Sequence, residues 1–170
     1  MLSDKDSTMV RSAIRVHFYA PGAWMPWWLR AGWRPTFSHV AIEPVPGAIH
    51  DLPKDGTAAW WETEPHQRER PPTVTLDIPG LVSMGGLAPI IAWTDNLYTG
   101  RRVEKIRCAL WYLRLWRRRR PRSCATLAAL WLKLASGIQS TAVTPDELYE
   151  DLDDIMECRR ILQRREHDRK

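Results

Sequence analysis

Two residues, Cys124 and His39, could together form a thiol nucleophile site. Cys124 lies in the segment Ser123–Trp131 (SCATLAALW), where Ser123 suits a helix N-cap and places the thiol in the first turn. The unpaired N–H groups and the dipole at a helix start favour the nucleophilic thiolate and could also hold an oxyanion. His39 lies near the start of the apolar segment Phe37–Glu43 (FSHVAIE) and could accept the thiol proton. We therefore expect the fold to bring Cys124 and His39 together.

A catalytic histidine also needs a polar group that fixes its tautomer. The candidates are Glu62 and Glu64, on one face of the predicted strand Ala58–Glu64, and Glu62 is preferred because it lies deeper within the strand. His17, on an early strand, and His50, in a predicted turn, are alternatives to His39. A histidine in an apolar strand can also be a structural core residue with no catalytic role.

These residues must be positioned by strands and helices, and the sequence predicts an α+β fold because strand patterns fill the first part of the chain and helix patterns the second. We expect one domain over residues 13–166, a flexible tail at residues 1–12 and a charged tail at residues 167–170. The predicted strands are Arg15–Tyr19, Phe37–Glu43, Ala58–Glu64, Thr73–Ile78 and Pro89–Trp93. The predicted helices are Pro26–Gly32, Arg101–Arg120, Cys124–Ala135 and Pro145 to about Arg165, and residues 44–56 are predicted to be a long turn.

The cysteines, histidines and glycines of the sequence give no reason to expect a disulfide, a metal or a cofactor. The three cysteines form no CxxC pair, and His66 and His167 lack partners at a metal-ligand spacing. The glycines at 80–86 lack the lysine and helix of a phosphate loop. The N-terminal segment has no apolar signal core and no run is long enough to span a membrane, so we expect a cytoplasmic protein, or one packaged in a virion or released by another route.

Charge is distributed unevenly, although the net charge is only +5. The segment Arg101–Arg122 is basic and Asp146–Glu157 is acidic, which is typical of solvated helices but also suits an anionic surface contact. Such a contact would use the unbroken run Arg117, Arg118, Arg119 and Arg120. Nucleic-acid binding is not expected, because Trp116 falls on the apolar stripe of the predicted helix and core packing explains it more simply. Most of the ten tryptophans should be core, with others lining a cleft or touching lipid.

The order of these motifs resembles the circularly permuted NlpC-type papain-like cysteine hydrolases, relatives of the lecithin-retinol acyltransferase-like proteins, in which the His strand precedes the Cys helix. The similarity spans the chain from about Val16 to Leu152. In chain order, it is carried by PWWLRAGWRPTFSHVAIE, WWETEP, SCATLAALW and TPDELYEDL. The resemblance implies a papain-like fold with a small antiparallel sheet or partial barrel packed on the Cys helix. It also implies Cys124 as the nucleophile, His39 as the base and Glu62 as the orienting residue.

The activity that the resemblance implies is hydrolysis or transfer of an amide, peptide or ester acyl group, with a peptide, a cell-wall peptide or a lipid as substrate. The chain departs from the family in having Ala125 where a serine commonly follows the cysteine, and in a longer basic helix before the nucleophile. One alternative is a catalytically silent papain-like module with a structural or binding role, associated with a phage or with secretion. The other is a basic binder of nucleic acid or an anionic surface. The Trp and Arg content suggests a bacterial or phage origin.

Overall fold

The computed structural model describes residues 9–22, 27–52, 57–83, 92, 102–115 and 120–167. Within these ranges, the strands are β1 (Met9–Tyr19), β2 (His39–Val45), β3 (Ala48–Asp51), β4 (Ala59–Glu62) and β5 (Val74–Ser83). The helices are α1 (Trp27–Trp33), α2 (Thr63–Glu69), α4 (Arg102–Tyr112), α5 (Cys124–Ser136) and α6 (Pro145–His167). The predicted strand Pro89–Trp93 lies outside the described residues except for Ala92, and β1 begins inside the predicted N-terminal tail.

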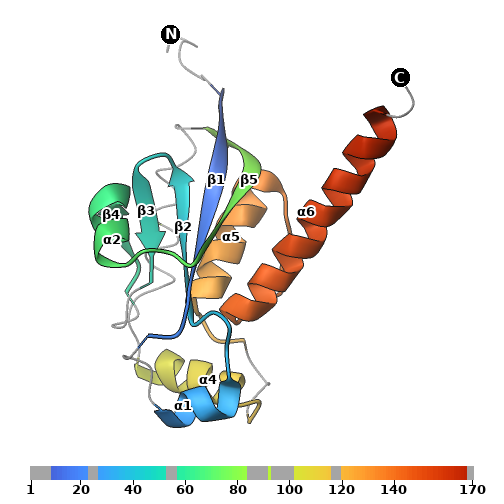
Figure 1. Ribbon diagram of the computed structural model, residues 1–170. Helices are drawn as coiled ribbons and strands as arrows, with labels where there is room; N and C mark the ends of the chain where they lie inside the picture. Colours follow the sequence, from blue (N-terminus) through green and yellow to red (C-terminus); the bar gives the residue numbers. More distant parts are fainter. Residues whose placement is uncertain are drawn as a thin grey trace.

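The strands form one antiparallel sheet in the order β4-β3-β2-β1-β5. Helix α5 packs along the sheet, and the long helix α6 lies beside it (Figure 1). This arrangement confirms the prediction of an α+β fold in which a small antiparallel sheet packs on the helix that begins with Cys124. Strand β1 is the longest strand of the sheet, and it pairs with β5 over ten residues and with β2 on its other side.

The core lies between the sheet and α5 because apolar residues alternate along β1 and β2. Ile14, Val16 and Phe18 of β1 are fully buried against this helix, which contributes Trp131 and Leu132. Alternation places the other residues of β1 and β2 on the opposite face, which is covered in part by α2. That opposite face carries buried polar side chains, and His39 and Glu43 are among them.

The hairpin of β2 and β3 differs from the single long turn expected over residues 44–56. The turn is in fact only Pro46 and Gly47, between the paired residues Val45 and Ala48. Gly47 has a φ of +89°, a value that glycine adopts without strain and that suits the position after proline in a tight turn. The short strand β3 follows directly, and this hairpin brings Asp51 back to the start of β2.

The predicted strand Ala58–Glu64 is also shorter than expected. Strand β4 ends at Glu62, and Thr63 begins α2, so Glu64 lies in a first helical turn instead of on the sheet. Pro65 explains the change, because proline cannot donate a hydrogen bond to a strand neighbour but is tolerated in the first turn of a helix.

Helices α1 and α4 lie together beyond the end of the sheet where β2 and α5 begin (Figure 1). Their approach is close at Gly32, where a Cβ atom would meet Cδ2 of Leu113 at 2.6 Å. The predicted helix Arg101–Arg120 ends early as α4, and Arg114 that follows has a φ of +59°. Residues 116–119 of the basic run lie outside the described part of the chain.

Candidate active site

Cys124 is the first residue of α5, and local hydrogen bonds hold this helix start in place. The N–H of Ser123 donates to Thr126 Oγ1 at 2.8 Å, and the N–H of Thr126 donates to Ser123 Oγ at 3.2 Å, forming the reciprocal cap of a helix start. The Ser123 hydroxyl also donates to the carbonyl of Val143 at 2.6 Å, which ties the helix start to the segment before α6. Cys124 itself is buried, with 8% of its surface exposed.

The first turn of α5 also contains the backbone N–H groups of Cys124 and Ala125. An α-helix leaves its first N–H groups without intrahelical acceptors, and the cap uses the N–H of Thr126. The N–H groups of Cys124 and Ala125 therefore lie at the positive end of the helix dipole beside the thiol, where an anion is stabilised.

His39 is the first residue of β2, so it and Cys124 meet at the end of the sheet where both elements begin. His39 is 6% exposed, and interaction with the Cys124 side chain is one of the influences that raise the pKa of its imidazole. Nε2 of His39 lies 2.6 Å from Oδ1 of Asp51, so Nε2–H is the donor to the carboxylate and Nδ1 is the nitrogen left for the thiol. The imidazole thus lies between a thiol and a carboxylate.

Asp51 ends β3 and is 4% exposed. Its Oδ1 accepts from His39 and from the N–H of Leu52 at 2.6 Å, and its Oδ2 lies 3.3 Å from Nε2 of His66. These donors supply the hydrogen bonds that a buried carboxylate needs to remain ionised.

The charges of this group favour an imidazolium at His39. Burial acts to lower the pKa of His39, but the Asp51 carboxylate, then the Cys124 thiolate, and hydrogen bonds to both outweigh burial and raise that pKa to about 9. Burial acts to raise the pKa of Asp51, but His39 and then His66 hold it below its usual range. The site therefore favours an imidazolium at His39 beside an ionised carboxylate at Asp51.

The two glutamates predicted as orienting residues are not near His39. Glu62 pairs with Ala48 and shares the face of His50, whereas pairing of Ile42 with His50 puts Asp51 on the face of His39. Glu62 is exposed at the end of β4, and Glu64 is exposed in the first turn of α2. The structure places Asp51 at the position proposed for Glu62. A Pro-Gly turn followed by the short segment AIHD was the available signal for it.

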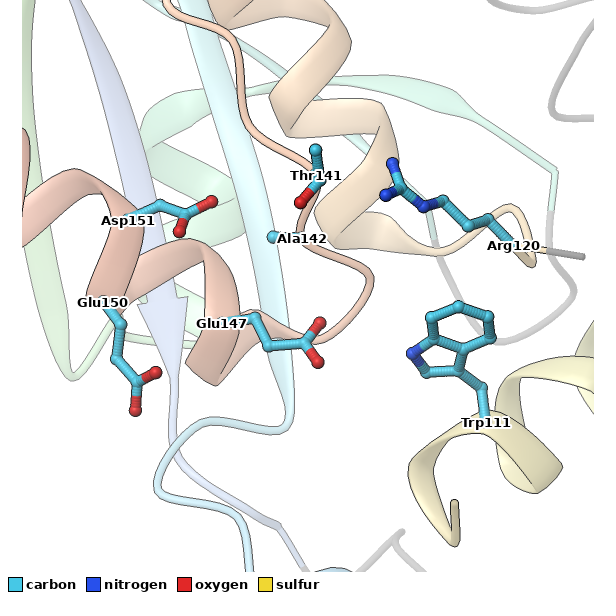
Figure 2. A pocket seen from close by; sticks show the side chains of 7 residues that line it. All are labelled: Trp111, Arg120, Thr141, Ala142, Glu147, Glu150 and Asp151. Atoms are coloured by element: carbon cyan, nitrogen blue, oxygen red, sulfur yellow. The ribbon is translucent and has the colours of Figure 1, made fainter. Parts of the chain in front are cut away.

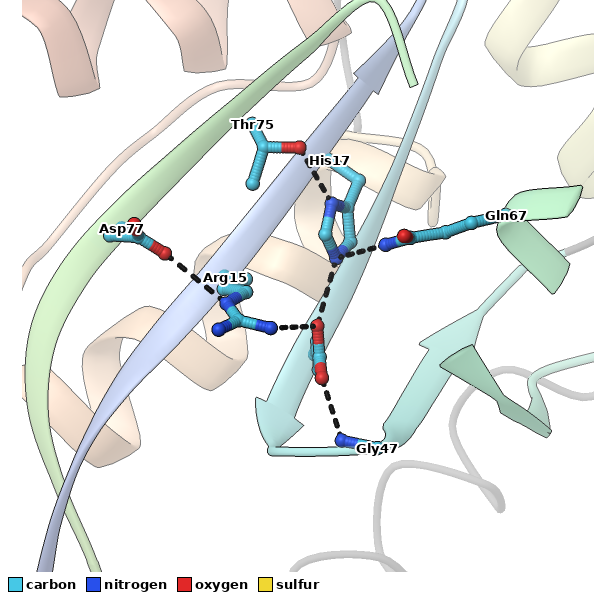
Figure 3. A network of polar contacts seen from close by, with 7 residues as sticks. Arg15, His17, Gly47, Gln67, Thr75 and Asp77 are labelled. Atoms are coloured by element: carbon cyan, nitrogen blue, oxygen red, sulfur yellow. Dashed lines mark hydrogen bonds and ion pairs between the residues drawn. The ribbon is translucent and has the colours of Figure 1, made fainter. Parts of the chain in front are cut away.

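The alternative histidines have other partners. His17 lies 2.9 Å from Thr75 Oγ1 through Nδ1 and 3.2 Å from Glu43 Oε2 through Nε2, within the polar network of Figure 3. Burial lowers the pKa of His17, although the hydrogen bond that His17 donates to Glu43 acts in the opposite direction. His50 accepts from Trp131 Nε1 at 2.8 Å and stacks on Trp60 with ring centroids 4.4 Å apart, which is a structural role in the core.

A cavity of about 640 Å³ lies near the start of α5, between α4, Arg120, the segment before α6 and the first turns of α6 (Figure 2). Figure 2 shows Trp111 and Arg120 on one side and three carboxylates on the other. It is lined by Trp111, Arg120, Thr141, Ala142, Glu147, Glu150 and Asp151. Cys124, His39 and Asp51 do not line this cavity. Of the predicted anionic-surface residues, Arg120 is described and lines it, and Arg117, Arg118 and Arg119 lie outside the described residues.

Fold and site together define an α+β protein with a buried Cys-His-Asp group at a helix N-terminus. Comparison of the chain with protein-family models, curated proteins and solved structures found no match. Among the helices of the described residues, none combines the length and apolar character needed to cross a bilayer. In the same part of the chain, no group of three or more His, Cys, Asp or Glu side chains has the arrangement of a metal site.

Proposed function

We propose that this chain is a cysteine-dependent acyl hydrolase or acyltransferase of the permuted papain-like type, with Cys124 as nucleophile, His39 as general base and acid, and Asp51 as orienting carboxylate. The observation that carries the proposal is the His39 imidazole, which hydrogen-bonds to the Asp51 carboxylate and interacts with the side chain of Cys124 at the start of α5. Such an ordered series of nucleophile, base and orienting group is the arrangement that activates a thiol. Asp51 takes the role that the resemblance gave to Glu62.

The steps follow from the positions of these groups. His39 accepts the thiol proton, and the thiolate sulfur attacks the carbonyl carbon of an amide, peptide or ester to form a carbon–sulfur bond. The N–H groups of Cys124 and Ala125 stabilise the oxyanion. The tetrahedral intermediate then collapses and expels the amine or alkoxide, which takes the proton from His39. A thioester remains on Cys124. Water or another acceptor then attacks the thioester, gives its proton to His39, and the departing sulfur recovers a proton as the free thiol.

The papain-like assignment is supported by chain order and by packing. The histidine strand precedes the cysteine helix, and the antiparallel sheet packs on that helix. Helix α5 begins at Cys124, so the proposed nucleophile lies at the positive end of the helix dipole, where a thiolate is stabilised. Ala125 follows the nucleophile without disturbing the cap, because the capping hydroxyls belong to Ser123 and Thr126.

The test is formation of an acyl-enzyme at Cys124. The protein is incubated with p-nitrophenyl acetate, and intact-mass and peptide-mass spectrometry follow a gain of one acetyl group. We expect the label on Cys124 and its loss in Cys124→Ala. Cys108→Ser and Cys158→Ser are the matched controls, since Cys108 is half-buried and Cys158 exposed, and both should retain labelling and turnover. Labelling that persists in Cys124→Ala at the wild-type rate would refute the proposal.

A non-catalytic binding role is the second candidate, and exposed apolar side chains on α1 and α4 favour it. Trp27 is 76% exposed, Trp28 45% and Ile106 61%, which is unusual for residues of this size. Tryptophan suits the boundary between water and lipid, and Arg34 beside α1 is exposed. Sedimentation with phosphatidylglycerol vesicles should then pull down the wild type and leave Trp27→Ala/Trp28→Ala in solution. Equal sedimentation of both proteins would remove this candidate.

A further inference from the structure

The Asp51 carboxylate has its donors divided between its two oxygens. Oδ1 accepts from His39 and from the backbone of Leu52, both at 2.6 Å, and Oδ2 faces Nε2 of His66 at 3.3 Å. A carboxylate held at both oxygens cannot rotate about its Cβ–Cγ bond without breaking a hydrogen bond. His66 is therefore in a position to fix the oxygen that His39 uses.

His66 comes from an element that the hydrophobic core does not require. Helix α2 has seven residues, none of them buried, so apolar packing does not explain where it lies. Polar contacts attach it to the sheet instead. The N–H of Thr63 donates to the carbonyl of Gly47 at 3.0 Å, and the side-chain amide of Gln67 lies 3.4 Å from Nε2 of His17 (Figure 3).

The ring of His66 is enclosed although its helix is not. Its side chain is 10% exposed, and aromatic rings of Tyr19 and Trp61 lie 6.2 Å and 6.1 Å from it between centroids. Tyr19 also contacts His39, with ring centroids 5.6 Å apart. The same tyrosine thus packs against both histidines that bind Asp51, which restricts the motion of the two rings together.

We infer that His66 is a positioning residue of the thiol site: its Nε2–H, donated to Oδ2, keeps the Asp51 carboxylate oriented toward His39. The inference rests on the proposed function, since it concerns the group that orients the general base. His66 touches neither the thiol nor the reacting carbonyl, so its effect reaches Cys124 only through Asp51 and His39. Supporting groups of this kind tune the residues that do the chemistry.

The test is the rate of Cys124 alkylation by iodoacetamide between pH 5 and 10, in a Cys108→Ser/Cys158→Ser background. We expect His66→Ala and His66→Asn to lower the rate at pH 6 by about fivefold, the factor that one net hydrogen bond provides. His66→Gln should keep the rate within about twofold, because glutamine carries its N–H donor near the place of Nε2 while asparagine is too short. Arg68→Ala, an exposed change on the same helix, is the control and should have no effect.

The outcomes separate this inference from the proposed function. Equal rates in wild type, His66→Ala and His66→Asn would overturn the inference, as would a His66→Gln rate as low as that of His66→Ala. An effect of Arg68→Ala as large as that of His66→Ala would also overturn it, because the whole helix would then be responsible. If His39→Ala leaves wild-type alkylation unchanged, the proposed function itself fails. Thermal unfolding identifies any variant that does not fold, and the asparagine and glutamine variants then decide.

Discussion

Replacing Asp51 by asparagine should show whether Asp51 or Glu62 is the carboxylate that orients His39. Asp51→Asn keeps the size of the side chain and removes its charge, which is the largest influence that raises the pKa of His39. The rise from 6.5 to about 9 corresponds to about 3 kcal/mol of imidazolium stabilisation. Without the Asp51 carboxylate, burial lowers the pKa of His39 and only the interaction with Cys124 still raises it. The pKa of His39 should therefore fall to 6.5 or below.

The assay is the pH dependence of iodoacetamide alkylation at Cys124, measured in the Cys108→Ser/Cys158→Ser background. At pH 6 to 7 the loss of the imidazolium deprives the thiolate of its partner, so the rate should fall by about 10- to 100-fold. Direct titration of the His39 ring by NMR gives the same pKa change independently. Glu62→Gln, an exposed carboxylate on the other face of the sheet, is the matched control and should leave the profile unchanged.

Two results would refute this reasoning. An Asp51→Asn profile that overlays the wild type would mean that the carboxylate does not act on His39. A Glu62→Gln profile that shifts as much as Asp51→Asn would restore the glutamate that the sequence favoured. Thermal unfolding of each variant is needed beside the rates, because breaking a buried ion pair can cost about 3–5 kcal/mol.

Three further predictions concern the scaffold. Trp131→Phe removes the donor to His50, so urea unfolding should show a loss of about 1–3 kcal/mol. Gly32→Ala should leave the free energy of unfolding within about 1 kcal/mol of the wild type in urea unfolding, because Cδ2 of Leu113 is the end of a flexible side chain that can move aside and alanine is favoured over glycine within helix α1. Because burial lowers the pKa of His17, the unfolded state binds its proton first, and stability should fall with a slope of up to about 1.4 kcal/mol per pH unit as pH drops below 6.5. His17→Asn should flatten that slope in urea unfolding at pH 5.5 to 7.5.

The start of the helix that carries Cys124, the proposed nucleophile, could be predicted from sequence because short-range signals define this helix. Ser123 caps α5 in an extended conformation, and Gly137 ends it with a φ of +68°, so residues next to the helix determine both boundaries. The alternation in Phe37–Glu43 likewise identified the strand with His39. These features depend on a few neighbouring residues and need no knowledge of what packs against them.

Asp51 could not be located in the same way, because β3 exists through pairing and not through its own pattern. Four residues give too little alternation to identify a strand, and strand preference depends on the neighbours that the fold supplies. The error at Glu62 has the same origin. Alternation showed that Glu62 and Glu64 would share a face if the strand continued, but only the register with β3 shows that this face is opposite to His39.

The proposed function makes a prediction about stability, because His39 and Asp51 are both buried polar residues. Buried ion pairs are often neutral or unfavourable compared with uncharged replacements of similar shape, whereas removal of one partner is costly. His39→Gln/Asp51→Asn replaces both charged groups by neutral ones that can still hydrogen-bond to each other. We therefore expect this double variant to unfold within about 1 kcal/mol of the wild type, or to be more stable, while Asp51→Asn alone is destabilised. Its Cys124 should be alkylated like an ordinary thiol. A double variant as unstable as the single one would instead indicate that the His39–Asp51 pair is retained for stability.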